Sequence, residues 1–303
     1  MKPSYITRAM SQDGSARIFA ADTTAIVAEA RRIHDTAKTA TAVLGRALTG
    51  TSLMGTLLKD KDNSLTLQFR GDGPAGMIVC VSDYAGNVRG YMEHPEVELA
   101  PNAHGKLDVG GAVGRGMLYV IRDLGIGEPY IGMAPLVSGE IAEDITSYYA
   151  SSEQTPSVCA LGVRVNPDLT VKSAGGFLLQ LLPGADEEVI TRLEANMQML
   201  PSVSAMIADG KTTEDVIAAV FTGIPYDIFD EFDVQYRCNC TRERYVKALC
   251  GLPDTDLAEL IAAPGDAETT CRFCGKTYAV THGEIEEILR HRAEEKQKTK
   301  SDT

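Results

Sequence analysis

Residues 1–180 carry short stretches in which apolar and polar residues alternate or apolar residues are continuous. Both patterns are typical of β-strands. Many of these stretches follow one another without an intervening helix, so the order favours antiparallel sheets packed on helices over a doubly wound parallel fold. The sequence therefore predicts an α+β domain. Its predicted strands are 5–10, 16–20, 65–69, 77–81, 88–92, 117–121, 158–165 and 170–171.

Three helices are predicted among these strands. Residues 23–37 place apolar side chains on one face, as an amphipathic helix does. Residues 39–59 differ, because Ala, Gly, Thr and Leu occur on every side of that segment. A helix without a polar face is buried all round, so this helix is expected at the centre of the domain. The third predicted helix is 140–150.

The pattern changes after residue 180. Residues 181–233 contain eleven acidic and two basic side chains, a net charge of −9. Two short amphipathic helices are still predicted there, and short helices depend on packing of their apolar face. We therefore expect 181–231 to be a metastable helical linker that folds only when docked. Its apolar positions are Val189, Leu193, Met197, Leu200, Val216, Ile217, Val220 and Phe221.

Length and charge limit the classes of protein that need to be considered. A chain of 303 residues is at the size where single cores divide into domains. Its net charge of −13 repels phosphate backbones, which argues against nucleic-acid binding. No run of 18 apolar residues and no apolar N-terminal segment occurs. We therefore expect neither membrane insertion nor secretion, and a cytoplasmic location.

Five of the seven cysteines lie between residues 238 and 274. Cys238 and Cys240 form a CxC pair, and Cys271 and Cys274 form a CxxC pair. Neither pair can complete a tetrahedron alone, whereas together they suit a four-sulfur Zn²⁺ site. The sequence thus predicts a compact zinc module at 232–290, which is followed by a charged tail at 291–303.

Three interpretations of this cluster remain open: a structural zinc site, a redox-responsive zinc site and no metal at all. CxC is uncommon in structural zinc sites, which favours the redox interpretation. Nearby cations stabilise thiolates, and thiolates react with peroxides to give sulfenic acid and then disulfides. The cations expected around the sulfurs are Arg237, Arg242, Arg244 and Arg272.

Little else in the chain suggests chemistry. Cys80, Cys159 and Cys250 are expected to be inert buried thiols. No convincing nucleophile and base accompany one another, so we do not expect an enzyme. A thiol oxidoreductase would need CxxC at the strand-to-helix junction of a thioredoxin-like pattern, which is absent. A zinc-ribbon regulatory or interaction protein with a constitutive metal remains the alternative.

The sequence resembles the 33 kDa redox-regulated bacterial chaperone family (heat shock protein 33 family) over nearly its whole length. The most specific match is the Cys-x-Cys-Thr-Arg-Glu-Arg stretch at 238–244 together with Cys-x-x-Cys at 271–274. Three N-terminal stretches are also similar and occur in the family order. They are Gly-Asp-Gly-Pro at 71–74, the Glu143-Asp144 to Gln154 region, and Ala-Gly-Gly-Phe-Leu-Leu-Gln at 174–180.

The resemblance implies an ATP-independent holdase that is inactive when reduced and bound to one Zn²⁺ per chain. It implies that oxidation forms Cys238–Cys240 and Cys271–Cys274 disulfides, releases zinc and unfolds the module and linker. The surface so exposed would bind unfolded client proteins, which makes the eight apolar positions named in 181–231 the candidate client-binding residues. The family further implies a monomer when reduced, a homodimer when oxidised, and transfer of clients to ATP-driven foldases.

Overall fold

The computed structural model describes residues 2–301, with side chains as far as residue 294. The chain forms two compact units, Met1–Arg237 and Cys238–Thr303, which are described separately. The first unit contains two five-stranded antiparallel sheets with helices between them and over one face. The predicted α+β class is therefore confirmed.

The first sheet has the strand order β10-β1-β2-β9-β8, and all its neighbouring strands are antiparallel. It joins the N-terminal hairpin to strands that lie far along the chain, because β2 pairs with β9 and β1 pairs with β10. The strands are β1 (Ser4–Ser11), β2 (Ala16–Asp22), β8 (Ser157–Val165), β9 (Val171–Leu181) and β10 (Tyr226–Val234).

The second sheet has the order β5-β4-β3-β6-β7. Its inner positions alternate with exposed ones, as expected for a sheet with one buried face. Strand β7 was not predicted, because it is short and four of its six residues are exposed. The strands are β3 (Ser64–Gly71), β4 (Met77–Asp83), β5 (Val88–Met92), β6 (Gly116–Asp123) and β7 (Tyr130–Pro135).

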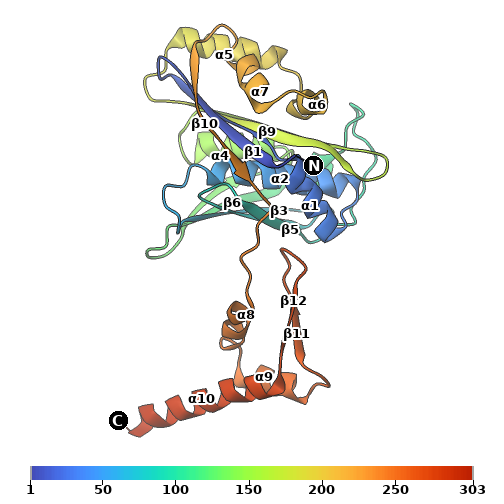
Figure 1. Cartoon of the computed structure of the whole chain (residues 1–303), viewed down its shortest axis with the longest axis vertical. Helices are drawn as coiled ribbons and strands as arrows, with labels where there is room; N and C mark the ends of the chain where they lie inside the picture. Colours follow the sequence, from blue (N-terminus) through green and yellow to red (C-terminus); the bar gives the residue numbers. More distant parts are fainter. Residues whose placement is uncertain (1, 302–303) are drawn as a thin grey trace. The chain divides into compact units, whose positions relative to one another are not determined.

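Helix α2 (Lys38–Gly55) occupies the centre between the two sheets (Figure 1), and nearly all its residues are buried. This confirms the prediction, made from the absence of a polar face, that the helix lies at the centre of the domain. Its glycines permit close packing, since a Cβ on Gly50 would lie 2.5 Å from Ile145 Cδ1. The other helices of this unit's inner layer are α1 (Thr24–His34), α3 (Val109–Val113) and α4 (Ala142–Ser151).

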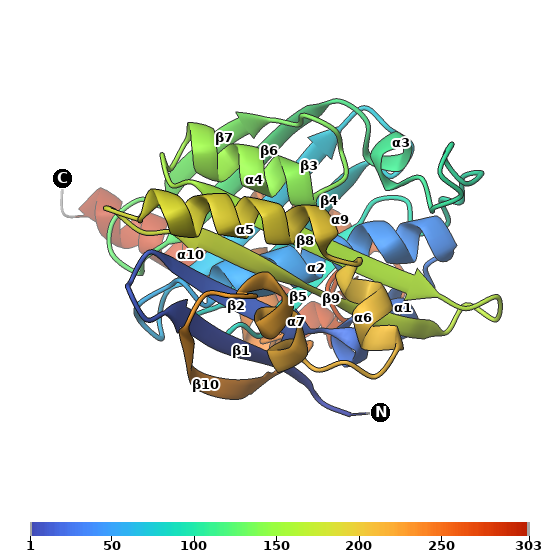
Figure 2. The same ribbon diagram turned by 90° about the horizontal axis from the view of Figure 1, so that it is seen from above.

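Three helices cover the outer face of the first sheet (Figure 2): α5 (Glu187–Met199), α6 (Val203–Ala208) and α7 (Thr213–Val220). They share a second apolar cluster with outward-facing strand residues such as Ile18 and Phe177. All eight linker positions named from the sequence belong to this cluster, five as buried residues and three as partly buried ones. We call this cluster the outer cluster.

The boundary expected at residue 231/232 falls inside a strand. β10 runs through that position and pairs with β1 from Tyr226 to Val234. The docking partner of α5–α7 is the first sheet of the same unit. The compact cysteine unit begins at Cys238.

The second unit consists of short elements around a small apolar core. Its buried apolar residues form a cluster of four: Leu257, Val280, Ile285 and Ile288. Its elements are α8 (Arg242–Leu249), α9 (Asp254–Ala262), the hairpin β11 (Ala267–Thr270) and β12 (Thr277–Val280), and α10 (His282–Ser301).

The charged tail expected at 291–303 is helical as far as Ser301, and its last two residues lie outside those described. The beginning of this segment is held by α9. Arg292 Nη1 lies 2.6 Å from Asp254 Oδ1 and donates to the Leu252 carbonyl at 2.8 Å. These contacts explain why α10 continues beyond the predicted module.

Candidate metal and redox centre

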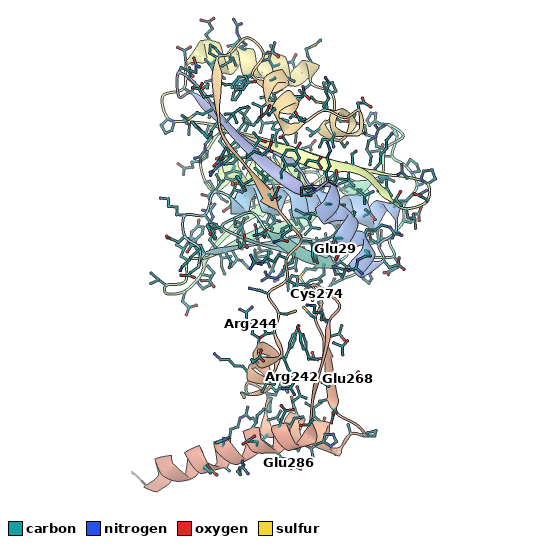
Figure 3. All side chains as sticks on the ribbon, viewed as in Figure 1. Glu29, Arg242, Arg244, Glu268, Cys274 and Glu286 are labelled. Atoms are coloured by element: carbon teal, nitrogen blue, oxygen red, sulfur yellow. The ribbon has the colours of Figure 1, made fainter. Side chains whose placement is uncertain are left out.

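The four clustered cysteines come from two backbone features of the second unit. Cys238 and Cys240 lie on an extended segment before α8, whose first turn is capped by the Thr241 hydroxyl accepting from the Arg244 N–H. Cys271 and Cys274 lie in the turn between β11 and β12 (Figure 3). Gly275 adopts a φ of 71° there, a conformation that favours glycine.

The fold brings the four sulfurs together. All of them lie within 4.8 Å of one another, with Cys240 and Cys274 3.3 Å apart and Cys238 and Cys271 3.8 Å apart. A tetrahedral zinc ion with Zn–S bonds of about 2.3 Å requires sulfurs roughly 3.8 Å apart. The donor set and its spacing therefore fit a zinc module.

Two tyrosines pack beside the sulfurs. The Tyr278 hydroxyl lies 3.2 Å from Cys240 Sγ and also donates to the Cys240 carbonyl. The ring of Tyr245, from α8, lies 5.1 Å from that of Tyr278. Groups that hydrogen-bond to metal ligands fix their orientation and tune their basicity. The sequence interpretation missed Tyr245, because nothing in the spacing of α8 shows that it reaches the hairpin.

Three of the clustered thiols, Cys238, Cys271 and Cys274, differ in acidity. Burial opposes ionisation of Cys271, but hydrogen bonds from Tyr245 and from backbone N–H groups outweigh it and lower the pKa of Cys271 to about 7. Burial raises the pKa of Cys238 and of Cys274. The hydrogen bond with Cys240, followed by burial, raises the pKa of Tyr278 to about 12. Cys271 is thus more readily ionised than Cys238 or Cys274 in the metal-free cluster.

Two of the four arginines expected beside the sulfurs, Arg242 and Arg244, hydrogen-bond to other groups. The Arg242 guanidinium donates to Glu284 at 2.6 Å and to the Ala279 carbonyl at 3.1 Å. Arg244 donates to the Asn239 carbonyl at 3.2 Å. These two side chains (Figure 3) tie α8 to its neighbours, and the phenols contact the sulfurs instead. Glu284, which is distant from Arg242 in sequence, accepts the hydrogen bond of the guanidinium that the local sequence had suggested for the sulfurs.

The remaining cysteines divide into two kinds. Cys80 and Cys159 are buried in the first unit, and burial raises the pKa of both thiols, so they are inert as expected. Cys250 is exposed, which contradicts the expectation that it is buried. It is the C-cap residue of α8, and its Sγ donates to the Val246 carbonyl at 3.5 Å.

Within the part of the chain that is described, no helix combines the length and apolar character needed to cross a membrane.

Comparison with known proteins agrees with the site. The family model described as Hsp33 protein matches residues 4–281. A 33 kDa chaperonin from Symbiobacterium thermophilum is 49% identical over 286 residues, which cover 94% of this chain and 97% of that protein. The 33 kDa chaperonin of Clostridioides difficile is 47% identical over 287 residues, which cover 94% of this chain and 98% of that protein.

A solved structure shows the same fold. The 33 kDa chaperonin (heat shock protein 33 homolog) of Thermotoga maritima superposes with a TM-score of 0.89 at 36% sequence identity, covering 97% of this chain and 100% of that one. These relatives are chaperones, and the family is not a family of enzymes. The sequence matches, the shared fold and the four-sulfur cluster agree, and the chain belongs to the Hsp33 family of chaperones.

Proposed function

We propose that this protein is a redox-switched, ATP-independent holdase that is inactive when reduced and zinc-bound. The observation that carries the proposal is the placement of all four sulfurs in a unit whose core, among the described residues, has four fully buried apolar side chains with partly buried ones around them. Such a unit depends on its sulfurs to stay folded. Any chemistry that changes the sulfurs therefore changes the fold.

In the reduced state, Cys238, Cys240, Cys271 and Cys274 would hold one Zn²⁺ per chain. The bound metal would supply folding free energy, about 10–16 kcal/mol in apparent terms for structural zinc. Each fully buried apolar side chain contributes roughly 1.5–3 kcal/mol. The four of the module's core therefore contribute roughly 6–12 kcal/mol, so the metal would supply a comparable or larger share.

Oxidation by hydrogen peroxide would proceed within each pair of cysteines that is adjacent in sequence, Cys238 with Cys240 and Cys271 with Cys274. One thiolate attacks the peroxide O–O bond, becomes a sulfenic acid and releases hydroxide. The neighbouring thiolate then attacks the sulfenic sulfur, forms the S–S bond and displaces a second hydroxide. Each Cys238–Cys240 or Cys271–Cys274 disulfide thus removes two electrons and two metal ligands.

The covalent connection through β10 would couple the module to the outer cluster. The chain leaves Cys238 directly into the segment that ends β10, an edge strand of the first sheet. The docked helices make few polar contacts with the sheet, among them Thr7 to Thr213 at 2.6 Å and Ser173 Oγ to the Ser204 carbonyl at 2.7 Å. Short helices held mainly by an apolar face are the elements that open first.

Release of α5–α7 would expose apolar surface on both the helices and the sheet. Contiguous apolar surface of this kind is suited to holding unfolded client proteins. By family membership, we further propose a cytoplasmic location, a monomer when reduced, a homodimer when oxidised, and transfer of clients to ATP-driven foldases.

A light-scattering assay of an aggregating client tests the proposal. We expect peroxide-treated protein to suppress aggregation without nucleotide, and dithiothreitol to abolish the effect. Equal suppression by reduced and oxidised protein would instead support the alternative, an interaction module with a constitutive metal. No suppression by either form would contradict holdase function.

A further inference from the structure

The first unit contains a cavity that the redox proposal does not use. It has a volume of about 780 Å³ and opens at one end of the space between the two sheets. Two stretches that carry the family resemblance reach it, through Glu153 after α4 and Gln180 in β9. Cavities of 300–1,000 Å³ are the usual size of small-molecule sites.

Cross-strand pairing builds the polar part of this cavity. In the first sheet Arg17 lies opposite Gln180, and in the second sheet Arg122 lies opposite Leu65. The two cross-strand pairs lie at the same end of their sheets, and all four residues line the cavity. Further inside, α2 and the turn after it add the apolar wall, with Met54 among its residues.

Part of the rim of the cavity is also apolar, while Lys59 and Asp60 add exposed charged side chains to the lining. Leu124, Ile126 and Tyr130 line it, and Ile126 is 88% exposed although it is a large aliphatic side chain. These residues lie on β7 or on the turn that precedes it. A cavity with apolar walls and a partly apolar rim favours a ligand with an apolar body.

Its two arginines are in different states. Arg122 is neutralised, because its guanidinium lies 3.0 Å from the Glu153 carboxylate. Arg17 has no carboxylate partner among the described residues, and its Nε and Nη2 both donate to the Gln180 amide oxygen at 3.1 and 2.8 Å. The Gln180 side chain is 1% exposed and is itself held by Ser157. Arg17 is thus a fixed cation with an unmatched charge.

A buried hydroxyl provides a second unmatched group. Tyr149 lines the cavity and is 3% exposed, yet its hydroxyl has no hydrogen-bond partner among the described residues. Its neighbour Tyr148 donates to Glu153 at 2.5 Å. Burial raises the pKa of Tyr149, while the charges of Arg122 and Arg17 oppose that rise. The phenol therefore remains a protonated donor close to both cations.

We propose that this cavity binds a small organic carboxylate with an apolar body. The guanidinium of Arg17 would pair with the carboxylate, since arginine matches carboxylate geometry and charge. The Tyr149 hydroxyl is the second donor, and the apolar wall takes the hydrocarbon body. The lining carries three basic side chains, Arg17, Lys59 and Arg122, and two acidic ones, Asp60 and Glu153. Its net charge of +1 favours a monoanion over the multiply charged phosphate of a nucleotide.

Calorimetric titration of decanoate, below its micelle concentration, into the full-length reduced protein tests the proposal. We expect saturable binding at one site and at least a tenfold loss of affinity in Arg17→Met. Arg70→Met is the matched control, because Arg70 makes the same pair of bonds to Gln68 and also lies over an aromatic ring, but outside the cavity. Its affinity should stay within twofold of wild type.

Two further sets of binding measurements separate the contribution of the carboxylate charge from that of apolar contact. Tyr149→Phe should weaken decanoate binding three- to tenfold with an unchanged melting temperature, so that loss of fold is not mistaken for loss of the site. Decanol and inorganic phosphate should each bind wild type at least tenfold more weakly than decanoate. The proposal is overturned if wild type shows no saturable binding, if Arg17→Met binds normally, or if decanol or phosphate equals decanoate. Client aggregation is not a readout here, so the result is independent of the redox proposal.

Discussion

The two units of this protein are stabilised in different ways. The first unit buries a large apolar cluster between its sheets and the outer cluster on the other face of one of them. The second unit buries four apolar side chains and places four sulfurs within 4.8 Å of one another. Burial of apolar surface is extensive enough to stabilise the first unit alone, whereas we expect the second to depend on its sulfurs. A redox switch is therefore best built in the second unit.

The comparison also applies within the first unit. The cluster between the sheets encloses α2 on all sides, whereas the outer cluster has helices on one side and solvent beyond them. We expect the stability of the layers to decrease in that order, from α2 to α5–α7 and then to the cysteine unit without metal. The expected outcomes below test this order, beginning with the largest effect.

Removal of the metal ligands should give the largest effect. We expect the quadruple Cys238/Cys240/Cys271/Cys274→Ser variant to contain no zinc and to lose protease resistance throughout the second unit. The reason is that the small apolar core cannot replace the metal. Elemental analysis and limited proteolysis check both points. Cys250→Ser is the matched control and should retain one zinc per chain, and zinc retained by the quadruple variant would contradict the site.

Undocking of α5 should give the next largest effect. Leu193→Asp places a charge in the outer cluster and removes a buried leucine, a change that costs about 3–5 kcal/mol. We expect this variant to suppress client aggregation partly even when reduced, as light scattering would show. Met199→Asp is the control, because Met199 lies on the same helix and is 84% exposed. If reduced Leu193→Asp suppresses aggregation no more than wild type does, docking of α5 does not control the activity.

A smaller effect is expected from the phenols beside the sulfurs. Tyr278→Phe removes the hydroxyl that lies 3.2 Å from Cys240 Sγ. Loss of such a group weakens metal affinity roughly 10–100-fold, and competition with a chromophoric chelator measures it. Tyr84→Phe, on an exposed residue of the first unit, controls for the substitution itself. Unchanged zinc affinity would mean that the contact does not support the thiolate.

The smallest effect concerns β10, the strand that leads to the cysteine unit. Hydrogen bonds from Arg8, one of them 2.7 Å long, lower the pKa of Asp230. A carboxylate with a lowered folded pKa stabilises the fold above its unfolded pKa of about 3.9 and loses that contribution as the pH falls through the folded value. Since the two side chains are 38% and 41% exposed, the contribution is below about 1 kcal/mol.

Hydrogen exchange of the β10 amides measures this contribution. Asp230→Asn should raise their exchange at pH 7 by less than about fivefold, and the difference from wild type should shrink as the pH falls below about 4. Asp227→Asn, on the same strand, is the control. A difference that stays constant from pH 7 to the lowest pH would exclude the ion pair as its cause.

Local patterns predicted much of the fold. The missing polar face of 39–59 placed α2 in the centre, and alternation located most strands of both sheets. β10 was missed because its acidic residues suggested a solvated linker. Their partners, such as Arg8 for Asp230, lie on β1 more than two hundred residues away. β9 was predicted only at its start, because Gly175 and Gly176 interrupt the pattern of a strand.

The candidate site shows the same limit. The cysteines were found because each pair is local and its spacing is characteristic. The groups around them were not, since the fold decides that Glu284 engages Arg242 while Tyr278 reaches Cys240. The cavity at Arg17 was also invisible in the sequence, because its residues come from both sheets and two helices.

Hydrogen–deuterium exchange of the whole chain, reduced and after peroxide treatment, tests the central claim most directly. We expect oxidation to remove protection from residues 238–290 and from α5–α7, while α2 and the strands around it keep theirs. Protection of α5–α7 that is the same in both redox states would contradict the claim that the sulfurs control the outer cluster.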